Sequence, residues 1–340
     1  MSAETNIHEP QGEARAGRGP IRGEADMEVA PGLLRVRQLF VNLYFYGDSG
    51  GGDRSWVLID AGLPYLEQHL VDAAAERFGP GARPAAIILT HGHFDHVGAL
   101  PNLAWRWDVP VYAHELERPY LNGKSSYPPP DPAVGGGAMS FLSRFYPRGP
   151  IDLGDRLQTL PADGSVPEMP GWRWLHTPGH TPGHVALFRE SDRTLIAGDA
   201  FVTTKQESAL DSNLQLWAHV RRPPAYFTPD WQAARRSVEL LADLHPETAA
   251  TGHGRPMRGE ELRRGLETLA RQWREDAVPH WGRYVNQPAL ADATGVVWTP
   301  PAVTDPQLMA LAALGAVGLG LWGLRAMRLR SWPSEDMYQG

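Results

Sequence analysis

The hydrophobic positions of this chain fall into short blocks that predict β-strands. Residues 33–47, LLRVRQLFVNLYFYG, alternate in part between apolar and polar side chains, and the SGGGD that follows predicts a hairpin turn. Short apolar runs then predict further strands. These runs are SWVLIDAGL, AAIILT, VPVYAHE, DRLQTL, WRWLHTPGH, VALFRE, RTLIAGD and TAATGHG.

Apolar residues recur at helical spacing in the segments between these strands. Three clear helices are predicted, at YLEQHLVDAAAERFG, DWQAARRSVELLADLH and GEELRRGLETLARQWRED, the first ending at Gly79. VGALPNLAWRW begins as a helix that Pro101 either breaks or restarts. Strands mixed with crossover helices favour a layered α/β architecture.

Changes in composition divide the chain into four parts. Residues 1–26 are polar and Gly-rich without an apolar leader, so we expect a disordered tail. Residues 27–276 carry the strand and helix pattern of the main domain, with a Pro- and Gly-rich irregular insert at 122–150. A connector at 277–306 and an apolar helix with a basic tail at 307–340 complete the prediction.

The apolar segment 308–324 leaves three arrangements open. As a helix its 17 residues reach about 26 Å, slightly less than the ~30 Å of a hydrocarbon core. It can span a membrane, lie on a membrane surface or pack against the domain. We expect a cytoplasmic protein, and membrane association through 308–324 stays open.

Composition limits the chemistry. The 340 residues are 42% hydrophobic and 21% charged, as in soluble globular proteins. A net charge of −7 without a basic stripe argues against a nucleic-acid partner. There is no cysteine, which excludes disulfides, thiolate zinc ligands and a cysteine nucleophile. A metal site must therefore be built from histidine and carboxylate side chains.

The motif HGHFDH at 91–96 directly follows the predicted strand AAIILT. Alternate residues of an extended segment face the same side, so His91 and His93 can converge on one ion. Asp95 and His96 follow as the chain turns and can face a second ion. Neutral imidazole and carboxylate suit zinc, manganese or ferrous iron.

Further candidate ligands follow other predicted strands. HTPGHTPGH offers His176, His180 and His184, LIAGDAF offers Asp199, and AATGHG offers His253. Glycine flanks these positions and allows the backbone to approach a site closely.

Taken in order, HGHFDH, PGHTPGH, Gly198–Asp199 and Gly252–His253 resemble the ligand motifs of the metallo-β-lactamase-fold hydrolases, in the branch of glyoxalase II and the lactonases. The resemblance covers roughly residues 30 to 260, and Asp60 matches a further structural carboxylate near the site. It implies an α/β fold of the αβ/βα four-layer sandwich type, in which two sheets pack face to face with helices outside.

The resemblance also implies two divalent metal ions, with Zn²⁺ expected before Fe²⁺ or Mn²⁺. The implied ligands are His91, His93 and His180 for the first ion, Asp95, His96 and His253 for the second, and Asp199 as the bridge between them. The bridging carboxylate and the lack of cysteine argue against β-lactam hydrolysis. His93 replaces the glutamate of flavodiiron relatives, and no flavin domain or nuclease insert is recognisable.

The expected reaction is hydrolysis of an ester, thioester or lactone. Two ions about 3.5–4 Å apart can share a water, and the bridging hydroxide attacks a carbonyl carbon. Asp95 is the expected proton acceptor for that water, and Tyr226 is a candidate for the tyrosine that lactonases place near the metals. Two other functions stay open: a mononuclear iron persulfide dioxygenase and a non-catalytic metal-binding sensor. The expected partner is a small-molecule substrate, and the oligomeric state is open.

Other polar and aromatic residues near these motifs receive less specific interpretations. We interpret His176 and His184 as structural histidines, and Lys205 as a solvated lysine or a contact for an anionic substrate. The aromatic side chains of the 122–150 insert form either a substrate lid or a packing cluster; they are Tyr127, Phe141, Phe145 and Tyr146.

Overall fold

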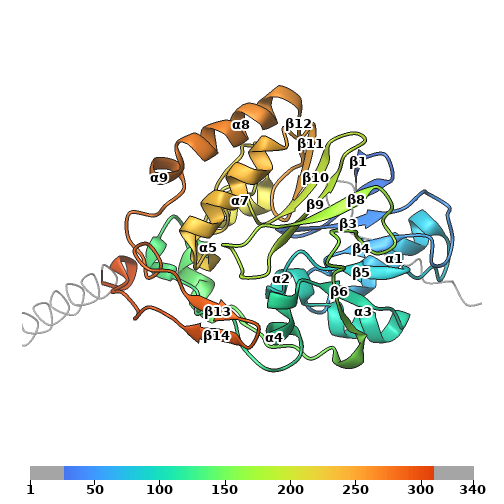
Figure 1. The fold of residues 1–340 in the computed structure, drawn as a ribbon, viewed down its shortest axis with the longest axis horizontal. Helices are drawn as coiled ribbons and strands as arrows, with labels where there is room; N and C mark the ends of the chain where they lie inside the picture. Colours follow the sequence, from blue (N-terminus) through green and yellow to red (C-terminus); the bar gives the residue numbers. More distant parts are fainter. Residues whose placement is uncertain (1–26, 310–340) are drawn as a thin grey trace, which may run out of the picture.

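A computed structural model of the chain describes residues 27–309 (Figure 1). The predicted tail 1–26 and all but the first residues of the predicted 307–340 segment lie outside the described residues. Within residues 27–309 no helix has both the length and the apolar character needed to cross a membrane.

The first sheet has seven strands in the order in which they occur along the chain. Its first four strands are antiparallel and its last four, from β4 onward, are parallel. The strands are β1 Met27–Ala30, β2 Leu33–Gln38, β3 Val41–Tyr46, β4 Val57–Ile59, β5 Ala86–Ile88, β6 Val111–Ala113 and β7 Leu157–Thr159.

The second sheet has five strands in the order β12-β11-β10-β9-β8. Its β10–β11 pair is parallel, and the other pairs are antiparallel. The strands are β8 Trp172–His176, β9 Val185–Arg189, β10 Thr194–Gly198, β11 Thr248–Thr251 and β12 Met257–Arg258.

Alternating side chains place each sheet between two apolar layers. In β5, Ile87 packs into the core shared with α1 and α3, whereas Ile88 packs into the core between the sheets. In β9, Phe188 packs toward α7 and α8, whereas Leu187 faces the first sheet. Figure 1 shows α1 and α3 beside the first sheet and α7 and α8 beside the second. The four-layer αβ/βα sandwich expected from the sequence is confirmed.

The predicted helices form close to their expected ends. Helix α1 spans Glu67–Phe78 and ends at Gly79, and Asp230 caps α7 at Trp231–Asp243 by accepting from two backbone N–H groups. Pro101 restarts a helix, because α2 covers Phe94–Val97 and α3 begins at Leu100 and ends at Trp107. The remaining helices are α4 Arg118–Leu121, α5 Ala138–Leu142, α6 Ala209–Leu214, α8 Gly259–Arg271 and α9 Trp273–Asp276.

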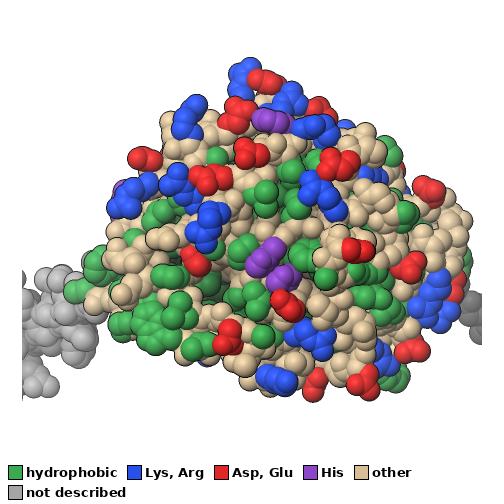
Figure 2. Space-filling view, in the orientation of Figure 1, with side chains coloured by type: hydrophobic (Ala, Val, Ile, Leu, Met, Phe, Trp, Pro, Cys, Tyr) green, Lys and Arg blue, Asp and Glu red, His purple; other side chains and the backbone are tan. Residues whose placement is uncertain are grey.

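The 277–306 segment contains structure that the sequence pattern did not predict. Strands β13 Leu290–Asp292 and β14 Gly295–Trp298 form a separate hairpin. The backbone N–H of Val296 donates to the Ser125 hydroxyl, so the hairpin is tied to the start of the 122–150 insert. On the face drawn in Figure 2, basic and acidic side chains are interspersed, and hydrophobic side chains gather at the lower left.

Candidate metal centre

Six of the seven candidate ligands follow the carboxyl ends of parallel strands. His91 and His93 follow β5, which pairs in parallel with β4, and α2 then carries Asp95 and His96. Asp199 follows β10 and His253 follows β11, which form the parallel pair of the second sheet. His180 comes from the loop between β8 and β9. Ligands from both sheets therefore meet at one edge of the sandwich.

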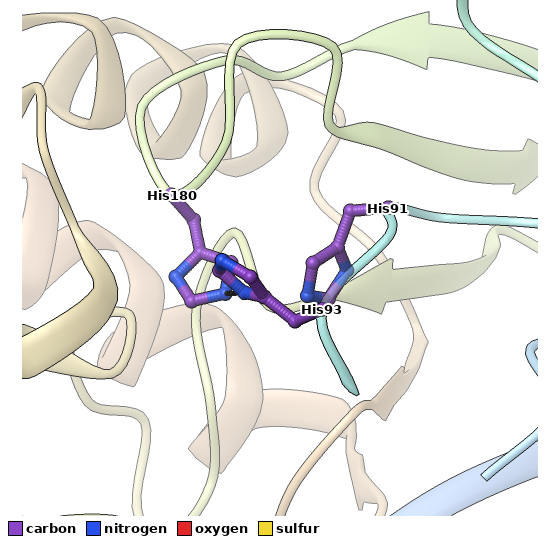
Figure 3. A group of neighbouring side chains, drawn as sticks. All are labelled: His91, His93 and His180. Carbon is purple, nitrogen blue, oxygen red and sulfur yellow. Dashed lines mark hydrogen bonds between the residues drawn. The ribbon is translucent and has the colours of Figure 1, made fainter. Parts of the chain in front are cut away.

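All seven candidate ligands are buried, and their ligand atoms form three compact groups. Within each group the atoms lie within 4.8 Å of one another. The groups are His91, His93 and His180; Asp95, His96 and His253; and His91, His96 and Asp199. Figure 3 shows His91, His93 and His180 pointing toward one another.

Asp199 lies between the first group, which is His91, His93 and His180, and the second group, which is Asp95, His96 and His253. Its Oδ2 is 3.4 Å from His180 Nε2 and 3.1 Å from His253 Nε2, and its Oδ1 is 3.7 Å from His96 Nε2. One carboxylate thus reaches a histidine of the first group and two of the second. This is the placement that a bridging ligand between two ions requires.

Several buried atoms of the cluster lack a hydrogen-bond partner among the described residues. They are His91 Nε2, His96 Nε2, His180 Nδ1 and Asp199 Oδ1. A buried polar atom without a partner costs free energy, so native structures satisfy such atoms with protein, water or an ion. The imidazole and carboxylate donor set fits zinc or another borderline divalent metal.

Hydrogen bonds at the opposite ring nitrogens orient two of the histidines. His96 Nδ1 lies 2.9 Å from Asp60 Oδ2, and His253 Nδ1 lies 2.9 Å from the Phe40 carbonyl oxygen. Each contact engages Nδ1 as a donor, so Nε2 is the ring nitrogen that faces the cluster. The Asp60 carboxylate also accepts from the backbone N–H and the hydroxyl of Thr90, which confirms it as a structural carboxylate beside the site.

The histidines of the cluster differ in pKa. Burial lowers the pKa of His93 to about 3, with a further contribution from His96, and burial likewise holds the pKa of His91 and His180 well below the ordinary value. Burial opposes protonation of His96 too, yet the carboxylates of Asp199 and Asp60 raise its pKa to about 10. The first group is therefore neutral and ready to bind a cation, and the second is the more anionic environment.

Glycine is required where the two groups approach the backbone. A Cβ atom at Gly252 would lie 2.0 Å from Asp199 Oδ1 and 2.8 Å from His96 Cε1. Any side chain at this position would displace a candidate ligand.

One protein-family model matches the part of the chain that carries these residues. The model described as the metallo-beta-lactamase superfamily matches residues 36–253, which include every candidate ligand. The chain belongs to the metallo-beta-lactamase superfamily.

Individual superfamily members show how far the similarity extends. A probable metallo-hydrolase of Bacillus subtilis, YflN, is 46% identical over 250 residues, which are 74% of this chain and 94% of that protein. A hydroxyacylglutathione hydrolase of Xylella fastidiosa is 32% identical over 146 residues, covering 42% of this chain and 40% of its own. The solved structure of a beta-lactamase domain protein from Burkholderia ambifaria matches with a TM-score of 0.51 at 22% identity, covering 74% of this chain and 76% of that one. The family and the Bacillus relative support a metal-dependent hydrolase.

The space beside the first group is small and mostly apolar. A cavity of about 10 Å³ adjoins His93 and His180, enough for roughly one water molecule. Phe227 stacks on His93 with ring centroids 4.5 Å apart. The other lining residues are Pro128, Pro129, Pro229 and Tyr284.

The remaining histidines near the superfamily motifs lie outside the metal groups. Both ring nitrogens of His184 are engaged, one by the Thr177 hydroxyl and the other by the Asp199 backbone N–H. His176 is exposed, stacks on His114 and contacts the Pro182 carbonyl oxygen. These contacts agree with the structural roles expected for His176 and His184.

The other candidate residues take varied positions. Tyr226 is buried in an apolar cluster with Met139 and Phe227, beside the metal groups and outside them. Lys205 is exposed and lines a separate groove with Arg221 and Arg264.

The aromatic residues of the insert lie in different places, and their role as a substrate lid stays a prediction. Only Tyr146 joins the Tyr226 cluster, whereas Phe145 is 74% exposed and Phe141 lies under the Arg144 guanidinium. Tyr127 is buried beneath the site, with its ring against His93.

Glu117 also lies beside the site, although the sequence pattern did not predict it there. This residue ends the short 3₁₀ turn Glu115–Glu117 after β6, and it is fully buried. Its segment, ELERPYL, has the charged composition of an exposed turn, so the sequence gives no signal for the burial.

Proposed function

We propose that the chain is a dinuclear metal hydrolase that acts on an ester, thioester or lactone. The observation that carries the proposal is the pair of buried three-residue groups, with Asp199 in contact with both. Three protein ligands for each ion leave a coordination position for water or substrate, as in catalytic zinc sites. Because the second group also offers three buried ligands, two bound ions are favoured over the single iron of a persulfide dioxygenase.

The ions and the side chains have separate tasks. Two divalent ions held by these residues would lower the pKa of a bound water and polarise a carbonyl oxygen. Asp95 presents its carboxylate within the second group, where it can accept a proton from the attacking water. Tyr226 keeps its proton, because burial and the Asp95 carboxylate raise its pKa well above the ordinary value. Its hydroxyl can therefore donate a hydrogen bond to a substrate oxygen.

The cavity lining supports an uncharged substrate. Among the described residues that line the cavity beside His93 and His180, none carries a cationic side chain. The cavity itself holds about one water molecule, so a substrate would meet these proline and aromatic rings from outside it, where they suit an apolar acyl or lactone group. The similarity to YflN, a probable metallo-hydrolase, supports hydrolysis as the reaction class. Membrane association through 308–324, a cytoplasmic location and the lack of a nucleic-acid partner stay predictions.

Metal analysis coupled to a substrate panel tests this proposal. The purified chain is expected to hold two zinc ions and to hydrolyse an aryl ester, a thioester or a lactone. His180→Ala should lower the metal content and reduce kcat/KM by roughly 100-fold or more, because the first group loses one of its three ligands. His280→Ala, at an exposed histidine, is the matched control and should change neither value.

The alternatives predict different results. One iron per chain with oxygen-dependent turnover of a persulfide would support the dioxygenase. Full metal loading without turnover on the panel would support the sensor. Tyr226→Phe should retain two zinc ions and lower kcat by roughly 10- to 100-fold if the hydroxyl stabilises a developing oxyanion. Tyr65→Phe, at a 90% exposed tyrosine, is its control.

A further inference from the structure

Glu117 is a buried carboxylate that accepts four hydrogen bonds. Its Oε2 accepts from the Gly92 backbone N–H at 3.0 Å and from the Tyr127 hydroxyl. Its Oε1 accepts from the Thr181 hydroxyl and the Gly183 backbone N–H, both at 2.8 Å. Burying an ionised carboxylate is costly unless hydrogen bonds compensate, and bonds to a charged acceptor are stronger than neutral ones.

Three of the four donors belong to the two loops that carry the first metal group, and the fourth, Tyr127, comes from the 122–150 insert. Gly92 lies between His91 and His93, whereas Thr181 directly follows His180. One carboxylate oxygen therefore holds the loop from the first sheet, and the other holds the loop from the second sheet. The distance between the loops is set by the width of a single carboxylate.

Close packing around Glu117 leaves the loops little freedom. A Cβ atom at Gly183 would lie 2.7 Å from the Glu117 backbone nitrogen, and one at Gly92 would lie 2.6 Å from the Tyr127 hydroxyl. Tyr127 adds a second support, because its hydroxyl also accepts from the Gly92 N–H at 2.9 Å while its ring lies against His93. The carboxylate thus joins the two loops through Gly92 and Gly183, close to the three histidines.

We propose that Glu117 is a positioning residue that fixes the His91–His93 loop against the His180 loop and thereby sets the affinity of this three-histidine group for its ion. The inference rests on the metal site of the proposed function and is independent of the substrate. A preformed site binds more tightly because less ordering is required when the ion arrives. Without the carboxylate, the three imidazoles would have to be brought together by the metal itself.

Glu117→Gln in the 340-residue chain tests the proposal. The glutamine side chain has nearly the same shape, but its NH₂ group must face one of the two donor pairs, so one loop loses its acceptor. Zn²⁺ binding to the metal-stripped chain is measured by competition with a chromophoric chelator. We expect the affinity of one of the two sites to fall about 10- to 100-fold, the range typical when a partner of a metal ligand is removed. The other site should change less.

A matched control separates positioning from general stability. Glu207 is also buried, and its carboxylate accepts from the Ala225 N–H and lies 3.4 Å from Arg222 Nε. Glu207→Gln should lower thermal stability while leaving both Zn²⁺ affinities within about twofold of the wild type. Equal Zn²⁺ affinities in Glu117→Gln and wild type, with only a loss of thermal stability, would overturn the proposal.

Further variants keep the test decisive if Glu117→Gln does not fold. Thr181→Val removes one donor with little change of shape, and Tyr127→Phe removes another. Each should weaken one Zn²⁺ site by about 3- to 10-fold, and unchanged affinity in both would contradict the proposal. A wild-type chain that binds two Zn²⁺ and hydrolyses none of the substrate panel would refute the hydrolase proposal alone, because the affinity comparison needs no turnover.

Discussion

At the scale of single residues, Asp60 shows how a strained backbone position serves the metal centre. Its φ angle of 60° lies in the left-handed region, which aspartate and asparagine tolerate better than most residues. In this conformation the carboxylate meets Thr90 on one side and His96 Nδ1 on the other. The contact leaves His96 Nε2 facing Asp199. The strain is therefore associated with the orientation of one candidate ligand.

Asp60→Asn is expected to weaken the second metal group. Asparagine retains the backbone conformation and an oxygen that can accept from Thr90, but its neutral amide is a poorer acceptor for the His96 N–H. We expect the affinity of one Zn²⁺ site to fall about 10- to 100-fold, measured by chelator competition on the metal-stripped chain. Asp155→Asn, at an exposed aspartate, should match the wild type. An unchanged affinity in Asp60→Asn would show that His96 is oriented by its packing alone.

Some residues of the site could be predicted from the sequence, and others could not. Five of the seven candidate ligands lie in the local motifs HGHFDH and PGHTPGH, and the other two, Asp199 and His253, each directly follow a glycine at the end of a predicted strand. Asp60 was predicted through the same family pattern. Glu117 was not, because its burial depends on Gly92 and Gly183, which come from two distant loops. A residue whose environment is assembled from separate segments has no local signal.

At the scale of helices and strands, prediction succeeded where one face of an element is apolar. Helices α1, α7 and α8 each bury a stripe of Leu, Ala or Phe, and their ends coincide with Gly79, Asp230 or a charged first turn. The β13–β14 hairpin was missed, because only its second strand, Gly295–Trp298, is rich in β-forming residues, whereas its first strand, Leu290–Asp292, is short and offers no alternating pattern. The hairpin is tied to Ser125 of the insert, so its stability comes from a tertiary contact.

The ends of β6 and β8 are joined by a stacked histidine pair that makes stability depend on pH. His114 lies just after β6 and stacks on His176 of β8, with ring centroids 4.2 Å apart. Burial, with a contribution from His176, lowers the pKa of His114 to about 4. The unfolded chain binds this proton at a pKa of about 6.5. The His114 contribution to stability is therefore present above pH 6.5 and is lost as the pH falls toward 4.

His114→Asn tests this dependence. The asparagine oxygen can replace His114 Nδ1 as the acceptor for the Leu116 N–H, but it does not titrate. From pH 7.5 to 5.5 the free energy of unfolding should fall by about 1 kcal/mol more in the wild type than in the variant. Urea unfolding at both pH values, on chains with equal metal loading, measures the difference. Parallel pH dependence in the two proteins would show that His114 titrates normally.

At the scale of the whole molecule, the metal centre lies where the two halves of the sandwich meet. His91 and Asp95 come from the first sheet side, whereas Asp199 and His253 come from the second. The protein also joins the halves by its own bonds at this edge. Asn42 of β3 donates from its side chain to the carbonyl groups of residues 251 and 254, and the Tyr44 hydroxyl donates to the same Thr251 carbonyl. We therefore expect the metal-free chain to fold and the metals to add stability to it.

Metal removal should lower the melting temperature without abolishing cooperative unfolding. Ions that bind only the folded state stabilise it by about 4 kcal/mol per site when present at about 1,000 times their Kd. For a domain of this size that corresponds to a shift of about 10 °C or more. Differential scanning calorimetry of the zinc-loaded and chelator-treated chain measures the shift, with His280→Ala expected to behave as the wild type. In Asp199→Asn the shift should be much smaller, because both ions lose the carboxylate that contacts both groups. If the melting temperature of Asp199→Asn shifts as much as that of the wild type, the ions bind to each half of the sandwich separately. If the chelator-treated wild type no longer unfolds cooperatively, the hydrogen bonds of Asn42 and Tyr44 are too weak to hold the sheets together.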